Sequence, residues 1–167
     1  MGCRKFVRDI YCWVMAILSI GLIWLGWHMV GLTFYDRWYH DALMLHKSFG
    51  VIVLLLVLIK TGWMLYTGVT QSSSPVISFN RISTHPAFYL LMGLITISGY
   101  LISTSAGASI SIFGIFGMPP IVTVGDGTRA IAIGLHYYLS YGTALLILLH
   151  ALIRAKPHLT RFTNGLP

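Results

Sequence analysis

Apolar residues occupy most of this chain in long runs, and charged residues separate the runs only at intervals. No Asp, Glu, Lys or Arg occurs in residues 10–35, 48–59, 61–80, 82–125 or 130–153. A membrane-spanning helix needs about 20 mainly apolar residues, whereas a strand of a membrane barrel needs only about 10 residues of alternating polarity. The pattern therefore predicts four membrane-spanning helices, near residues 11–30, 41–66, 86–103 and 129–154.

Composition supports lipid as the medium around these helices. Charged residues make up 9% of the 167 residues and apolar residues 56%, whereas a soluble domain averages about 25% charged residues. The length suits one compact domain. We therefore expect a single membrane domain over residues 1–167 and the fold class of an all-α integral membrane protein, a bundle of four transmembrane helices.

The distribution of basic residues predicts the orientation of the bundle. Eight of the 11 Lys and Arg residues fall on the side of the two termini, and Arg37, Lys47 and Arg129 fall on the other. Basic residues concentrate on the cytoplasmic side of membrane proteins, so both termini are expected in the cytoplasm of a bacterial inner membrane. The net charge of +7 then reflects this bias and contact with anionic lipid rather than a nucleic-acid surface.

The first apolar run resembles a signal peptide only superficially. It is too long, and no small-residue cleavage site follows it, so a retained helix is expected. Cys3 and Cys12 both lie on the reducing side of the membrane, which argues against a disulfide. Residues 70–84 are rich in Ser and Thr and are expected to form a loop, with Thr84 capping the next helix and Pro86 in its first turn.

Histidines inside the predicted spans suggest the chemistry. His136 and His150 are 14 residues apart on the fourth helix. At 100° and 1.5 Å per residue they share one face and are separated by roughly 21 Å along the axis. Histidine inside a membrane is costly and usually functional. One face at two depths is what two haem groups would need, one near each membrane surface.

A third histidine matches the depth of the first of these. His46 lies about one turn inside the outer end of the second helix, and His136 about two turns inside the outer end of the fourth. A single such histidine is most simply a hydrogen-bonded core residue, but the depth-matched combination favours His46 and His136 as the two axial ligands of an outer haem b. Lys47 adjoins His46 and could pair with a haem propionate. Gly50 either lets the porphyrin approach or serves ordinary helix packing.

The inner site is less defined, and its alternatives stay open. His150 is a candidate iron ligand there, but the first helix offers no histidine at that depth. Cys12 could bind iron as a thiolate or be a small buried apolar residue. His85 could be the neighbour of His150, or an interfacial group that contacts a haem propionate or a quinone. The long apolar connection over residues 105–127 is too broken for a fifth span, and we expect it to lie in the outer interface over the outer haem.

Several stretches together resemble the bacterial cytochrome b561 family, four-helix di-haem proteins of the inner membrane. The likeness covers nearly the whole chain. It lies in WY and LHKSFG around the start of the second helix, TH-P-FYLL at the start of the third, GYLISTSAG and SIFGIFGMP after it, and the pair His136 and His150. The branch it is most similar to often occurs beside a small periplasmic lipid-binding protein.

The resemblance implies a ligand scheme from which this chain departs. In the family, the second helix pairs with the first histidine of the fourth helix, which here corresponds to His46 with His136. The first helix pairs with the second, through a histidine that stands directly before a Trp; here Cys12 stands before Trp13. The second ligand for His150 is therefore missing or replaced. Family members also often carry paired histidines after the last helix, where this chain has only His158.

These features predict a membrane electron carrier. Electrons would pass between the quinone pool, ubiquinone for example, and a donor or acceptor at the periplasmic face, with a periplasmic lipid-binding or redox protein as a possible partner. Oxidation of quinol or superoxide is implied only by the resemblance. Two alternatives differ in class: a haem-bearing anchor subunit of a larger oxidoreductase, and a membrane scaffold that has lost its haem.

Overall fold

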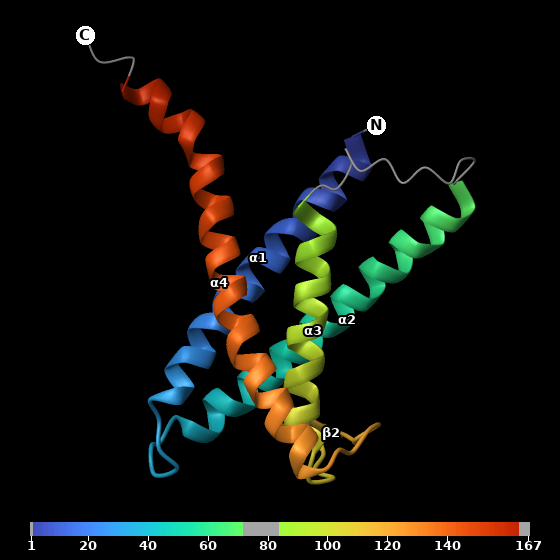
Figure 1. Cartoon of the computed structure of the whole chain (residues 1–167), viewed down its shortest axis with the longest axis vertical. Coiled ribbons are helices and arrows are strands. Elements are labelled where there is room, and N and C mark those ends of the chain that lie inside the picture. The colour runs from blue at the N-terminus through green and yellow to red at the C-terminus, as the bar shows by residue number, and fades with distance from the viewer. Residues whose placement is uncertain (1, 72–83, 164–167) are drawn as a thin grey trace.

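Helices form almost all of the described chain. The computed structural model describes the backbone of residues 2–71 and 84–163, and the side chains of residues 6, 7, 9–67, 88–149, 151 and 152. The helices are α1 (Gly2–Val30), α2 (Tyr39–Gln71), α3 (Thr84–Thr104) and α4 (Asp126–Thr163), and two short strands, β1 (Ile110–Ile112) and β2 (Phe116–Met118), lie between α3 and α4 (Figure 1).

The helices extend beyond the ranges that the apolar pattern predicted. In α1, α2 and α4, a stretch of 18 residues or more is apolar enough to cross a membrane, over Asp9–Val30, Tyr39–Thr67 and Asp126–Leu149, and α3 has a shorter apolar segment, Phe88–Thr104. The extra turns are mostly polar or basic. Backbone hydrogen bonding continues into residues that lie beyond the membrane-crossing part of each helix. A hydropathy pattern therefore gives the length of the membrane span and not the full length of the helix. The predicted loop over residues 70–84 lies largely outside the described residues.

The helices pack into a bundle that is tighter at one end. Here α3 lies against both α2 and α4, while α1 contacts mainly α2. Figure 1 shows the α1–α2 connection and the β-hairpin together at this end, which we call the hairpin end, and shows α2 and α4 diverging toward the other end. A small core forms where α1, α2 and α3 meet, from Met15, Val53, Val57, Met92 and Ile95. Most other large apolar side chains face outward, as lipid-facing residues do.

A tight turn joins α1 to α2. The Asp36 carboxylate accepts hydrogen bonds from the backbone N–H of Thr33 at 2.6 Å and from its hydroxyl at 2.7 Å. These bonds favour the charged carboxylate and lower the pKa of Asp36, which is fully exposed outside the spans. Phe34 lies beside this turn and contacts the rings of Tyr35, Tyr39 and His40. Such an aromatic cluster is typical of the membrane–water interface.

A β-hairpin occupies part of the connection between α3 and α4. Its strands pair antiparallel, with Ile110 opposite Met118 and Ile112 opposite Phe116. The turn between them places Phe113 at φ 50° and Gly114 at φ 71°, and the left-handed conformation at the second position suits glycine. Strands of three residues are too short to produce a recognisable alternation of polarity, so the sequence pattern did not indicate them.

Candidate functional site

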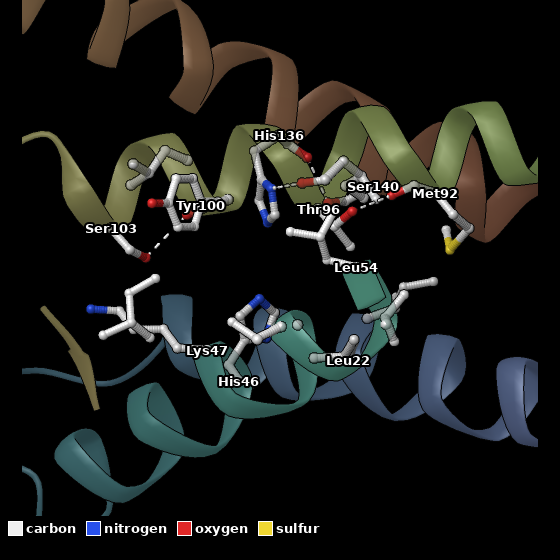
Figure 2. Close-up of a pocket in the computed structure, with 18 of the residues that line it drawn as sticks. Leu22, His46, Lys47, Leu54, Met92, Thr96, Tyr100, Ser103, His136 and Ser140 are labelled. Carbon is white, nitrogen blue, oxygen red and sulfur yellow. Dashed lines mark hydrogen bonds between the residues drawn. The ribbon is translucent and has the colours of Figure 1, made fainter. Parts of the chain in front are cut away.

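A cavity opens between the helices toward the hairpin end. It has about 1020 Å³ of space free of protein atoms when the open solvent at its mouth is counted. All four helices and β1 contribute to its walls. Leu22, Leu54, Val51, Met92, Ile102 and Ile110 represent its apolar lining, and His46, Lys47, Thr96, Tyr100, Ser103, His136 and Ser140 its polar lining (Figure 2).

Two histidines face each other across this cavity. Figure 2 shows His46 on α2 and His136 on α4 pointing toward one another from opposite walls, and their ring centroids are 6.1 Å apart with an interplanar angle of 75°. Because an imidazole nitrogen lies about 2 Å from a bound transition-metal ion, two imidazoles on opposite sides of one ion have ring centres roughly 6 Å apart. The spacing of the ring centroids therefore fits two imidazoles that share one iron.

Hydrogen bonds from α3 fix the orientation of His136. Its Nδ1 lies 2.8 Å from the carbonyl oxygen of Ile95 and 3.2 Å from the hydroxyl of Ser98, and that hydroxyl also donates to the Ile95 carbonyl at 2.8 Å. A carbonyl oxygen can only accept, so Nδ1 carries the proton in this network. Nε2 is then the nitrogen with a free lone pair. This is the arrangement by which proteins orient a metal-binding histidine.

His46 is held differently. Its Nδ1 is buried and has no hydrogen-bond partner among the described residues. The ring is instead confined by packing: a Cβ added to Gly26 of α1 would lie 3.2 Å from Cε1 and 3.7 Å from Nδ1 of His46. A buried polar atom without a partner costs about 1–3 kcal/mol. A ring kept at that cost beside a cavity is what a ligand-binding histidine would require, and it makes no structural hydrogen bond through Nδ1 among the described residues.

Glycines make room for both rings. A Cβ on Gly99 of α3 would lie 2.9 Å from Cε1 of His136, closer than real contacts allow, whereas a Cβ on Gly50 would meet nothing within 4 Å. Gly50 lines the cavity, so a side chain there would enter the space that a flat cofactor would occupy. Of these three glycines, the sequence pattern predicted a role only for Gly50. Gly26 and Gly99 act on side chains of other helices, so helix periodicity alone gave no signal for them.

Lys47 adds the positive charge of the site. Its side chain lines the cavity and is partly buried. Figure 2 places it at the same end of the cavity as Ser103 on the opposite wall. Within the described part of the chain, no ion pair between Lys47 and an acidic side chain is present. A half-buried ammonium group without a carboxylate beside it is suited to an anionic group of a ligand.

The remaining predicted site residues lie elsewhere. Cys12 is a partly buried free thiol on α1 and does not line this cavity. Its neighbourhood is aromatic: Tyr11 donates a hydrogen bond to the Leu56 carbonyl at 3.0 Å and its ring centroid lies 6.1 Å from that of Tyr89. The predicted roles of His150 and His85 concern side chains outside the described residues. The structure thus brings together His46, Lys47 and His136, and leaves the partner of His150 undetermined.

Two opposed imidazoles in an apolar cavity of a transmembrane bundle are typical of membrane proteins that carry haem. Comparison with known proteins agrees with that class. The model of the family described as "Prokaryotic cytochrome b561" matches residues 9–163, and the chain belongs to this family. It is therefore a bacterial membrane b-type cytochrome that acts in electron transfer, and the family implies b-type haem as its cofactor.

One known protein is similar to this chain over most of its length. The chain is 37% identical over 149 residues to "Cytochrome b561 homolog 2" of Escherichia coli strain K12, and the match covers 87% of this chain and 79% of the relative. No solved structure is significantly similar to the chain.

Proposed function

We propose that this protein carries electrons between quinone in the bacterial inner membrane and a partner at the periplasmic face. His46 and His136 would hold its best-defined cofactor, one haem b. The observation that carries the proposal is the 6.1 Å separation of the two ring centroids across the cavity. The hydrogen bond from Nδ1 of His136 to Ile95 is the second support, since it leaves Nε2 free for iron.

Each part of the site has a separate task in this proposal. Bound haem supplies reversible uptake and release of one electron. His136 and His46 would hold it from two helices, so that its position would depend on how α2 and α4 each pack against α3. The apolar lining, including Leu54, Met92 and Ile102, excludes water and sets a low local polarity, which is how the protein adjusts the potential.

Lys47 is proposed to pair with a haem propionate. Propionates are the only anionic groups of haem, and an ammonium group at one end of the cavity would set which edge of the porphyrin points there. This orientation would direct the propionates toward the hairpin end. Because basic residues are concentrated at the opposite end, we propose that the hairpin end faces the periplasm and that both termini are cytoplasmic.

A second haem nearer the cytoplasm is proposed with His150 as one ligand. Its partner would be Cys12 or a group near His85, and the two choices predict different spectra, because a thiolate ligand shifts both the absorption and the potential of haem. Quinone would meet the cytochrome within the bilayer, and a small periplasmic redox or lipid-binding protein would be the partner outside.

The test is a reduced-minus-oxidised absorption spectrum of the purified protein with haem quantified per chain. His46→Ala and His136→Ala should each abolish the bis-imidazole spectrum of the haem at the cavity. His28→Ala is the matched control, because His28 is exposed on α1 and stacks on Trp24 at 5.5 Å, away from the cavity. Full haem content in His46→Ala would disprove the ligand assignment. If His150→Ala removes one of two haems, the inner site is occupied, and Cys12→Ala then distinguishes the two candidate partners.

A further inference from the structure

The β-hairpin presents an apolar surface that no other part of the described chain covers. Ile115 is 82% exposed, Phe116 60% and Ile121 82%. No charged residue occurs between Ile82 and Gly125. A water-facing loop of this length would normally carry charged or strongly polar side chains at its tip. The question is therefore what surrounds these exposed apolar side chains.

The hairpin lies beside a part of α2 that is itself within the membrane span. A Cβ on Gly114, at the turn, would be 3.6 Å from Sδ of Met44, and the ring centroid of Phe113 is 5.3 Å from that of Phe49. The span of α2 begins at Tyr39. At 1.5 Å per residue, Met44 and Phe49 lie about 7.5 Å and 15 Å along the helix from that point. Figure 1 shows the hairpin extending sideways from the bundle, not away along the helix axes.

Side-chain hydroxyls from the helices satisfy backbone groups of this segment. Ser48 of α2 is completely buried. Its Oγ accepts a hydrogen bond from the N–H of Phe113 at 2.9 Å and lies 3.4 Å from the carbonyl oxygen of Ser111. Tyr100 of α3 accepts a hydrogen bond from the N–H of Ile121 at 2.7 Å.

These bonds are what non-helical backbone requires when it lies away from water. In the hydrocarbon core, non-helical backbone is tolerated only where it is buried in protein or lines a water-filled cavity, so a hairpin with lipid-facing side chains belongs nearer the headgroups. The strands pair with each other, and the N–H of Ile115 donates to the Ile112 carbonyl at 2.9 Å. The Ser48 hydroxyl accepts from a residue of the turn, Phe113, and the Tyr100 hydroxyl from Ile121 near the end of the segment.

We propose that residues 110–122 lie at the boundary between the lipid headgroups and the acyl chains at the hairpin end, with Ile115, Phe116 and Ile121 in contact with the upper part of the acyl chains. Its two faces then have different neighbours. Ile110 and Ile112 are buried against the helices, and Ile110 lines the cavity, while the opposite face meets lipid. The occupant of the apolar surface is phospholipid, and the proposal does not depend on whether haem is bound.

The experiment uses the full-length protein in liposomes of phosphatidylethanolamine and phosphatidylglycerol with no other protein present. A phospholipid that carries a photoactivatable diazirine in its acyl chain is added, and adducts on the natural chain are located by peptide mass spectrometry. In parallel, Ile115→Cys is treated with a membrane-impermeant maleimide. Arg37→Cys is the matched control, because Arg37 is exposed in the turn at the same end. Labelling is read on the peptide that contains the new cysteine and is normalised to the denatured protein, so the natural cysteines do not contribute.

The expected result is lipid adducts on the peptide containing Ile115 and Phe116, and maleimide labelling of Ile115→Cys at least tenfold slower than that of Arg37→Cys. Equal labelling of the two variants would place the tip in water and overturn the proposal. Slow labelling without lipid adducts would mean that a second copy of the chain covers the surface, which also overturns it. The lipid adducts are measured on the natural chain, so misfolding of a variant cannot hide the answer.

Discussion

Nδ1 of His136 and the carbonyl oxygen of Ile95 lie 2.8 Å apart, although 41 residues separate them in the chain. The bond joins α4 to α3, a helix that contributes no histidine to the cavity among the described residues. Ser98 completes the arrangement one turn later on α3. The opposing His46 has no equivalent bond among the described residues, so the two imidazoles of the site differ in the support that they receive.

This difference predicts an effect of Ser98→Ala on the haem potential. Hydrogen bonding to Nδ1–H increases the electron donation of the imidazole to a bound metal, which favours the oxidised iron. Loss of the 3.2 Å contact from Ser98 should therefore raise the midpoint potential by some tens of millivolts, about 59 mV being a tenfold change for one electron. Haem content should stay near normal because the Ile95 carbonyl remains. The measurement is a redox titration followed at the α band.

Ser105→Ala is the control for that titration. Its hydroxyl donates to the Ile102 carbonyl near the end of the same helix, and Ser105 does not line the cavity. An unchanged potential in Ser98→Ala, with haem fully bound, would show that Ser98 has only a packing role. A complete loss of haem would instead mean that the serine is needed to hold the ring.

Gly99→Ala should lower haem occupancy. The new methyl group would lie 2.9 Å from Cε1 of His136, so either the ring or α3 must move, and a ligand displaced by a few tenths of an ångström binds iron less well. We expect a several-fold lower haem-to-protein ratio after purification. Gly93→Ala is a matched control on the same helix, because its Cβ would make an ordinary contact of 3.7 Å with Val57. Equal haem content in the two variants would contradict the prediction.

Lys47→Gln should lower the midpoint potential of the cavity haem. A positive charge near the iron stabilises the reduced state, which carries one less positive charge than the oxidised state. Lys47→Arg should largely preserve the potential, since the charge is kept. Lys60→Gln provides the comparison: this lysine lies on the same helix, with Nζ 5.8 Å from the Tyr11 ring centroid, and does not line the cavity. A similar shift in both glutamine variants would point to a general surface-charge effect.

Ser48→Ala should destabilise the protein. The substitution removes the acceptor of the Phe113 N–H at a completely buried position, and an unpaired buried polar group costs about 1–3 kcal/mol. The measurement is the free energy of unfolding in detergent, with hydrogen exchange at residues 110–118 as a local readout. Thr67→Ala, whose hydroxyl donates to the Trp63 carbonyl within its own helix, should have a smaller effect. A stability loss equal to that of Thr67→Ala would mean that the hairpin does not rely on Ser48.

The sequence predicted the helical membrane fold well, because length and hydropathy directly express the thickness of the bilayer. It also predicted that His46 and His136 lie at one depth, since depth follows from counting residues along two helices. It did not reveal Gly26, Gly99 or Ser98. Their roles depend on the rotation and closeness of neighbouring helices, which one-dimensional periodicity does not encode. The sequence did not predict the hairpin either, because its strands form only three residue pairs.

The two facing histidines come from α2 and from α4, and α4 follows the other helices along the chain. During synthesis, α1, α2 and α3 therefore emerge and enter the membrane when only His46 of the histidine pair is present. The Ile95 carbonyl and the Ser98 hydroxyl, which bond to the His136 ring, are already present on α3 at that stage. As proposed, this pair can hold its cofactor only once α4 is in place: α4 completes the pair, and the Ile95 carbonyl of α3, which precedes α4 in the chain, orients its imidazole.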